Sequence, residues 1–171
     1  MSGRAGREQR AAATRVELPL LDRLIDDAPD EPRDAPLSAA EAMGLLRRAV
    51  RRDLEALLNA RRRWNSWNPE YGELKTSPVA FGIPDFTSGA FNDKGQRDRV
   101  CAEIEDTIRR FEPRFVTVRV SLTDENSDQL DPTLHLRIDA LLHAEPAPEP
   151  VAFDTVVDPT TSDIVVRQHD S

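Results

Sequence analysis

The sequence predicts an α+β fold in which two main helices pack on one face of a small, largely antiparallel sheet. Two observations predict it. In the first part of the chain, apolar residues recur every three or four positions over two long stretches, which is the spacing of helices with one buried side. In the last part, apolar and polar residues alternate, which is the spacing of strands with one buried face.

The first long helix is predicted to begin at Ser38. Ser38 and Glu41 have the spacing of a capping box, in which each side chain binds a free backbone N–H group of the first turn. The helical pattern breaks after Trp64. The apolar stripe of this helix consists of Met43, Leu46, Val50, Leu54, Leu57 and Leu58.

Seven arginines occupy the other faces of this helix and the residues just after it. A solvated helix face is the ordinary interpretation of such a charge run, and a basic strip that meets an acidic partner is the alternative. The seven are Arg47, Arg48, Arg51, Arg52, Arg61, Arg62 and Arg63.

The second helix is predicted from Asp93 to Phe111, with Asp93 and Gln96 at capping-box spacing. Between the two helices, residues 65–86 form a loop that is long for a compact domain, and residues 79–86 are expected to form a short strand or an ordered turn. The buried stripe of the second helix consists of Val100, Ile104, Ile108 and Phe111.

The last third of the chain is predicted to form strands that pair mainly in antiparallel order. The terminal strand is expected at a sheet edge, where unpaired backbone amides and carbonyls allow another chain to add a strand. The predicted strands cover residues 115–122, 134–142, 151–157 and 164–166.

The organisation at the two ends is simple. Residues 1–17 are expected to form a disordered tail, and residues 18–37 a short amphipathic helix followed by a proline-rich acidic linker. The folded domain is expected to cover residues 38–167, and residues 168–171 are expected to form a second tail. The short helix cannot be stable alone, so it must dock on its own domain or on another chain.

Composition narrows the function. The net charge of −8 argues against a nucleic-acid-binding protein. No apolar run is long enough to insert into a membrane. The single cysteine, Cys101, favours a reducing compartment, which is the cytoplasm. The three histidines, His135, His143 and His169, do not have the spacing of a metal site. We therefore expect no metal, no cofactor and no catalytic residues.

Glu112, Pro113 and Arg114 stand where the second helix is predicted to end and the first strand to begin. Pro113 cannot continue a helix and disfavours helical geometry at Glu112, so the two charged residues flank a stiff elbow. An arginine there can form forked hydrogen bonds with carboxylates or carbonyls of a partner. The elbow is therefore interpreted as a partner-binding joint rather than a catalytic centre.

Five short stretches follow one another in a recognisable order. They are LLDRL at 20–24, RDLEALLN at 52–59, FGIPDF at 81–86, IRRFEPR at 108–114 and PEPVAFDT at 148–155. In this order and spacing they resemble TssE, the baseplate wedge subunit of bacterial type VI secretion systems, and thereby the wedge proteins of contractile phage tails. The resemblance covers about residues 18–167.

The resemblance implies a structural role without enzymatic activity. It implies that Glu112, Pro113 and Arg114 anchor the subunit to the helical core bundle of the wedge, formed by TssF and TssG, with TssK as a further baseplate partner. It also implies that the sheet edge serves as a template for the first sheath ring of TssB and TssC through strand exchange between chains.

Three alternatives stand beside this hypothesis. Glu112 and Arg114 could serve only to staple the helix–strand junction of their own chain. The domain could be a regulatory adaptor that binds a response-regulator-type partner through the acidic segment 22–34 and the basic helix face. Glycoside hydrolysis would need two carboxylates facing each other across a cleft, and the acidic residues fall instead in linkers, turns and exposed helix faces.

Overall fold

A computed structural model describes residues 19–25, 30, 37–62, 67–68, 70–86, 94–123, 133–145, 147–158, 161 and 163–169. The predicted N-terminal tail, nearly all of the acidic linker and the predicted capping residue Asp93 lie outside these described residues.

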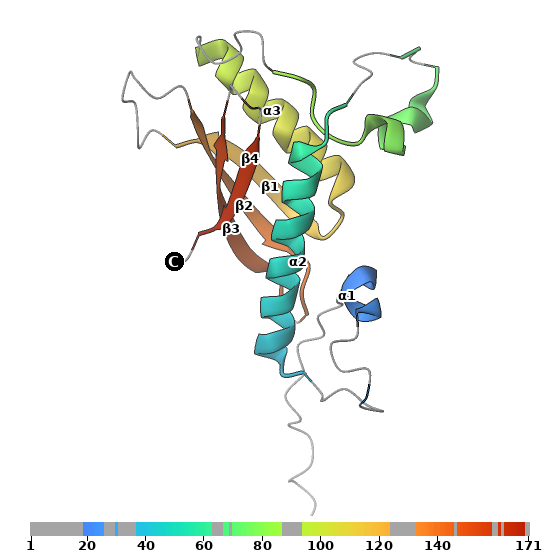
Figure 1. Ribbon diagram of the computed structural model, residues 1–171, viewed down its shortest axis with the longest axis vertical. Helices are drawn as coiled ribbons and strands as arrows, with labels where there is room; N and C mark the ends of the chain where they lie inside the picture. Colours follow the sequence, from blue (N-terminus) through green and yellow to red (C-terminus); the bar gives the residue numbers. More distant parts are fainter. Residues whose placement is uncertain are drawn as a thin grey trace, which may run out of the picture.

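The predicted α+β class is confirmed (Figure 1). The helical segments occupy the first part of the chain and the strands the last part, as the change of hydrophobic period predicts. In chain order the described elements are α1 (Leu20–Leu24), α2 (Ala39–Asn59), the 3₁₀ turns η1 (Gly72–Thr76) and η2 (Pro78–Ala80), α3 (Lys94–Phe111), β1 (Phe115–Leu122), β2 (Leu134–Leu142), β3 (Glu149–Val157) and β4 (Ile164–Gln168).

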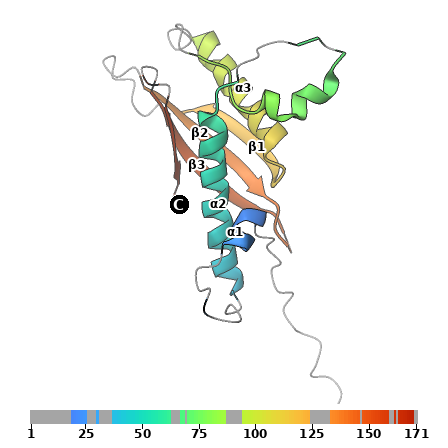
Figure 2. The ribbon, with the colours of Figure 1, turned by 45° about the vertical axis from the view of Figure 1, so that its right-hand side comes forward.

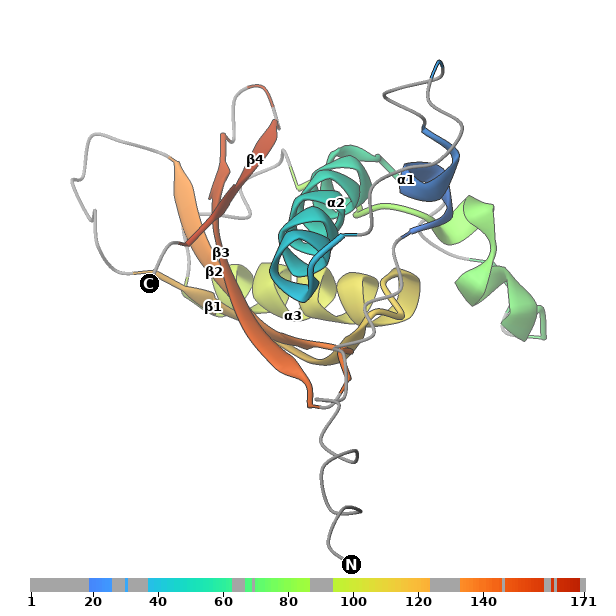
Figure 3. The same ribbon diagram turned by 90° about the horizontal axis from the view of Figure 1, so that it is seen from below.

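The four strands form one antiparallel sheet in the order β1-β2-β3-β4, so β1 and β4 are its two edges. Both long helices lie on the same face, with α3 alongside β1 and α2 alongside β4 (Figure 3). The core lies between these layers, and Leu54, Ile138 and Phe153 are fully buried in it. One face of the sheet is thus covered by helices, while the opposite face carries polar side chains.

The predicted capping box of α2 is confirmed. The Oγ atom of Ser38 accepts a hydrogen bond from the N–H of Glu41 at 3.3 Å, and the Glu41 carboxylate accepts one from the N–H of Ser38 at 2.8 Å. These hydrogen bonds from Ser38 hold the pKa of Glu41 below its usual value. The cap therefore fixes where α2 begins.

The end of α2 comes earlier than the sequence pattern suggests, at Asn59. The chain leaves the helix because it pairs with the loop after η2: the N–H of Ile83 donates to the carbonyl of Ala60 at 3.0 Å, and the N–H of Arg62 donates to the carbonyl of Ile83 at 2.9 Å. Residues 79–86, expected as a short strand or an ordered turn, form part of η2 and a turn with a single bridge, Arg61 to Ile83.

Gly82 makes this close approach possible. Its φ is +97°, and a Cβ atom there would lie 2.3 Å from the carbonyl oxygen of Ala60. Only glycine adopts such a backbone without strain and leaves room for the neighbouring chain. The turn seats Ile83 in the core and places the ring of Phe81 edge-on against Phe111, with centroids 5.4 Å apart.

Candidate functional site: the helix–strand elbow

The elbow joins the last turn of α3 to β1. The N–H of Glu112 still donates to the carbonyl of Ile108 at 2.8 Å, and the carbonyl of Glu112 accepts from the N–H of Phe115 at 3.3 Å. Pro113, which has no N–H, stands between them and ends the helix. Glu112 is buried, with 5% exposed, whereas Pro113 is exposed and the Arg114 side chain is 23% exposed.

Glu112 and Arg114 bind each other across the proline. The Nε of Arg114 donates to Oε1 of Glu112 at 2.5 Å, and its Nη2 donates to Oε2. The backbone N–H of Arg114 also donates to Oε1 at 3.2 Å. This forked pair fixes the guanidinium plane relative to the elbow, because both carboxylate oxygens are engaged.

The pair extends into a network of alternating charges. Nη2 of Arg114 donates to Oδ2 of Asp53 at 2.8 Å, and Oδ1 of Asp53 accepts from Nε of Arg52 at 3.0 Å. Arg52 in turn holds both carboxylate oxygens of Asp22, at 2.9 and 3.1 Å. The series Glu112–Arg114–Asp53–Arg52–Asp22, called the elbow network below, thus ties α1, α2 and the elbow together.

The network favours its own charged state. Burial alone would lower the pKa of Arg114, but hydrogen bonds and charges from Glu112, and then from Asp53, outweigh it and raise the pKa. The hydrogen bond to Asp22 is the main cause that raises the pKa of Arg52, and the same bond lowers the pKa of Asp22. These three groups are therefore ionised at neutral pH.

Three members of this network, Asp22, Arg52 and Asp53, are not among the site residues that the sequence predicts. Asp53 lies 61 positions from Arg114, and Asp22 lies 30 positions from Arg52, so no local spacing connects either of these pairs. A signal was present nevertheless: all three fall within the stretches LLDRL and RDLEALLN that carry the family resemblance.

The helix α1 docks on its own domain, but through its polar side. Its Asp22 contacts Arg52 of α2, and the two helices lie together in Figure 2. Leu20 and Leu24 are 69% and 72% exposed, and no residue of α1 is buried. An amphipathic helix that packed for stability would bury its apolar side. Here that side faces outward, next to the elbow network.

The predicted basic strip on α2 is largely neutralised within the chain. Arg47 pairs with Glu149, Arg51 with Glu55 at 3.0 Å, and Arg62 with Glu103 at 2.7 Å. Arg52 belongs to the elbow network. These four arginines serve contacts inside the protein, which weakens the case for a continuous basic surface that meets an acidic partner.

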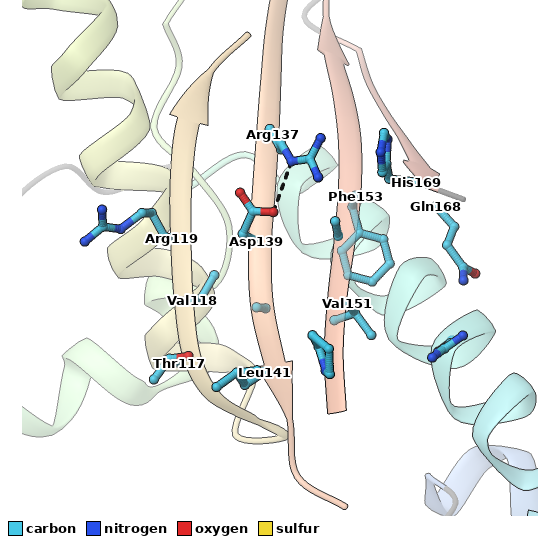
Figure 4. A pocket seen from close by; sticks show the side chains of 14 residues that line it. Thr117, Val118, Arg119, Arg137, Asp139, Leu141, Val151, Phe153, Gln168 and His169 are labelled. Atoms are coloured by element: carbon cyan, nitrogen blue, oxygen red, sulfur yellow. Dashed lines mark hydrogen bonds and ion pairs between the residues drawn. The ribbon is translucent and has the colours of Figure 1, made fainter. Parts of the chain in front are cut away.

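A shallow hollow of about 900 Å³ lies over β1, β2 and β3 (Figure 4). Asp139 is the single carboxylate among its described lining residues, and Arg137 holds it at 3.0 Å. The hollow thus lacks the facing carboxylates that glycoside hydrolysis requires. Across the described parts of the chain, no three metal-binding side chains come together. None of the helices described is long and apolar enough to span a bilayer.

A small α+β domain whose most organised polar site ties its own elements together has the character of a structural module. The particular family is set by comparison: residues 45–147, more than half of the chain, match the baseplate wedge protein gp25 family, and the chain belongs to it. TssE belongs to the same family, so the resemblance is confirmed. The match includes the elbow but not α1. No curated protein and no solved structure matches the chain.

Proposed function

We propose that this protein is a non-enzymatic component of a type VI secretion baseplate, located in the cytoplasm, where it links the wedge complex to the contractile sheath and templates sheath assembly. Membership in a structural baseplate family supports the general role. The ion-paired elbow is the observation that carries the finer assignment, because it presents a fixed guanidinium beside an exposed proline at one end of the sheet.

In this proposal Glu112, Pro113 and Arg114 form the wedge-binding site. Glu112 is buried, so it does not contact the partner itself; its role is to orient Arg114. Pro113 and the exposed part of Arg114 make the contact. A guanidinium that is already oriented loses less conformational entropy on binding a carboxylate or a carbonyl than a free one would. The partners are the wedge proteins TssF and TssG, with TssK nearby.

The sheath-binding site is proposed at the other edge of the sheet. β4 is an edge strand, and an edge strand can accept an extended segment from another chain. The segment would come from the sheath proteins TssB and TssC. Because β1 and β4 are separated by two strands, the wedge site and the sheath site lie on opposite edges of one sheet.

The test separates docking from the stapling alternative. Arg114→Ala and Arg114→Lys are compared in co-purification with the wedge proteins, and thermal unfolding is recorded for each. Docking predicts at least a tenfold loss of association in both folded variants, since a Lys ammonium cannot form the forked pair with Glu112 that orients the guanidinium of Arg114. Arg109→Ala is the matched control, because Arg109 is 56% exposed and pairs only with residues of its own helix among the described contacts. Stapling predicts a lower melting temperature with wedge association intact.

A further inference from the structure

The outer side of β4 is partly occupied by α2, although β4 is an edge strand. The Nδ2 atom of Asn59 donates to the carbonyl of Ile164 at 2.8 Å, and Oδ1 of Asn59 accepts from the N–H of Ile164 at 2.9 Å. The side-chain amide thus offers one donor and one acceptor to the same residue. A residue of a neighbouring antiparallel strand would make the same pair of bonds.

A second side chain from α2 continues along this side. Nη1 of Arg51 donates to the carbonyl of Val166 at 3.3 Å. Backbone groups of alternate residues point to the same side of a strand, so Ile164, Val166 and Gln168 all face outward. Among the described residues, the N–H of Val166 and both backbone groups of Gln168 have no partner there. The beginning of β4 is therefore covered, and its end is open.

The opposite edge is guarded in a different way. Oε2 of Glu105 in α3 accepts a hydrogen bond from the N–H of Val120 in β1 at 3.0 Å. A carboxylate accepts but cannot donate, so it does not reproduce a strand, and Arg109 holds this one in place at 2.5 Å. The amide of Asn59 does reproduce a strand. Because of this difference, β4 is the edge at which the backbone of an incoming strand can take the place of the Asn59 side chain.

We propose that Asn59 and Arg51 form a latch that keeps the accepting edge of β4 closed in the free protein and yields it to an extended segment of another polypeptide chain. The proposal rests on the strand addition to β4 proposed above. The incoming backbone replaces in kind the two bonds between Asn59 and Ile164, and it gains the open groups of Val166 and Gln168. Asn59 is an exposed residue, so its side chain can leave without opening the core.

The experiment measures the affinity of the full-length chain for the purified sheath proteins of the same machine, by biolayer interferometry, for wild type and Asn59→Ala. We expect Asn59→Ala to bind about five- to tenfold more tightly, the factor that corresponds to roughly one net hydrogen bond no longer displaced. Hydrogen exchange at the Ile164 amide should become faster in the free variant and be protected again in the complex. Asn68→Ala is the matched control, because the side chain of Asn68 bonds only to Glu70 among the described contacts.

The outcomes separate the two ideas. If wild type binds the sheath and Asn59→Ala binds equally or more weakly, the latch is refuted and strand addition survives. If neither binds, strand addition fails and the latch fails with it. If Asn59→Ala does not fold, Arg51→Gln is held to the same comparison; it removes the bond to Val166 together with the ion pair between Arg51 and Glu55 within α2. Tighter binding by either variant, with the control unchanged, supports the latch.

Discussion

At the scale of single residues, Glu112 is the one charged residue that is buried in the described part of the chain. It is 5% exposed, and its carboxylate oxygens are engaged by the side chain and the backbone of Arg114. Removing one member of a buried ion pair costs more than the pair contributes, because the other charge stays buried without its partner. The carboxylate of Glu112 thus sets the orientation of the Arg114 guanidinium.

We predict that Glu112→Ala lowers the free energy of unfolding by about 2 to 3 kcal/mol, measured by urea denaturation. Arg114 keeps its contact with Asp53, which limits the loss. Asp106→Ala is the control: its partner Arg109 and Asp106 itself are both more than half exposed, so the change should stay within about 0.5 kcal/mol. Equal effects of the two substitutions would show that Glu112 does not brace the elbow.

Two glycines give opposite predictions for the same substitution. Gly82→Ala should destabilise by about 3 kcal/mol, because φ is +97° and the new Cβ would collide with the carbonyl of Ala60. Gly44→Ala in α2 should stabilise by about 0.5 to 1 kcal/mol, since its Cβ would meet only the flexible end of Arg48 at 3.6 Å. Thermal unfolding of both variants tests this, and an unchanged Gly82→Ala protein would contradict the strained turn.

At the scale of elements, α1 is held to α2 by the ion pair between Asp22 and Arg52. The pKa of Asp22 is lowered below its ordinary value of 3.8, mainly by the hydrogen bond from Arg52. A lowered pKa means that the folded state favours the ionised form. The attachment is therefore complete above the ordinary pKa and is lost as the pH falls through the lowered one.

We predict that α1 stays attached from about pH 5 to pH 8 and detaches only as the pH falls below the ordinary Asp22 pKa of 3.8, followed by the amide NMR signals of residues 20–25. Asp22→Asn should release α1 already at pH 7. Arg23→Gln changes a charge on the same helix outside the network and should leave the signals in place. Signals of Asp22→Asn that match the wild type at pH 7 would contradict the ion-pair attachment.

The elements show which features the sequence could predict. Local signals were sufficient for α2, through its capping box, and for the strands, through their alternation. The end of α2 was missed because it depends on Gly82, which lies more than twenty positions further along the chain. The elbow residues were found from their own spacing, whereas Asp53 and Asn59 act through contacts 61 and 105 positions away, for which no local pattern exists.

At the scale of the whole molecule, the two proposed binding sites lie on the two edge strands of one sheet. The elbow begins β1, the latch lies on β4, and the sheet between them is covered on one face by both long helices (Figure 3). Three inter-strand spacings separate the two edges, roughly 14 Å. A force on the sheath side would reach the wedge side through backbone hydrogen bonds rather than through a flexible linker.

The outward apolar side of α1 gives the last prediction. Leu20→Ser together with Leu24→Ser should leave the melting temperature nearly unchanged, because these residues are 69% and 72% exposed and bury little surface in the free protein. The same double variant should weaken co-purification with the wedge proteins, since α1 adjoins the elbow through the elbow network. Val79→Ser is the control, as Val79 is 45% exposed and lies on η2. If the double variant binds the wedge as wild type does, the docking surface ends at Arg114, and the ion pair between Asp22 and Arg52 has only an internal role.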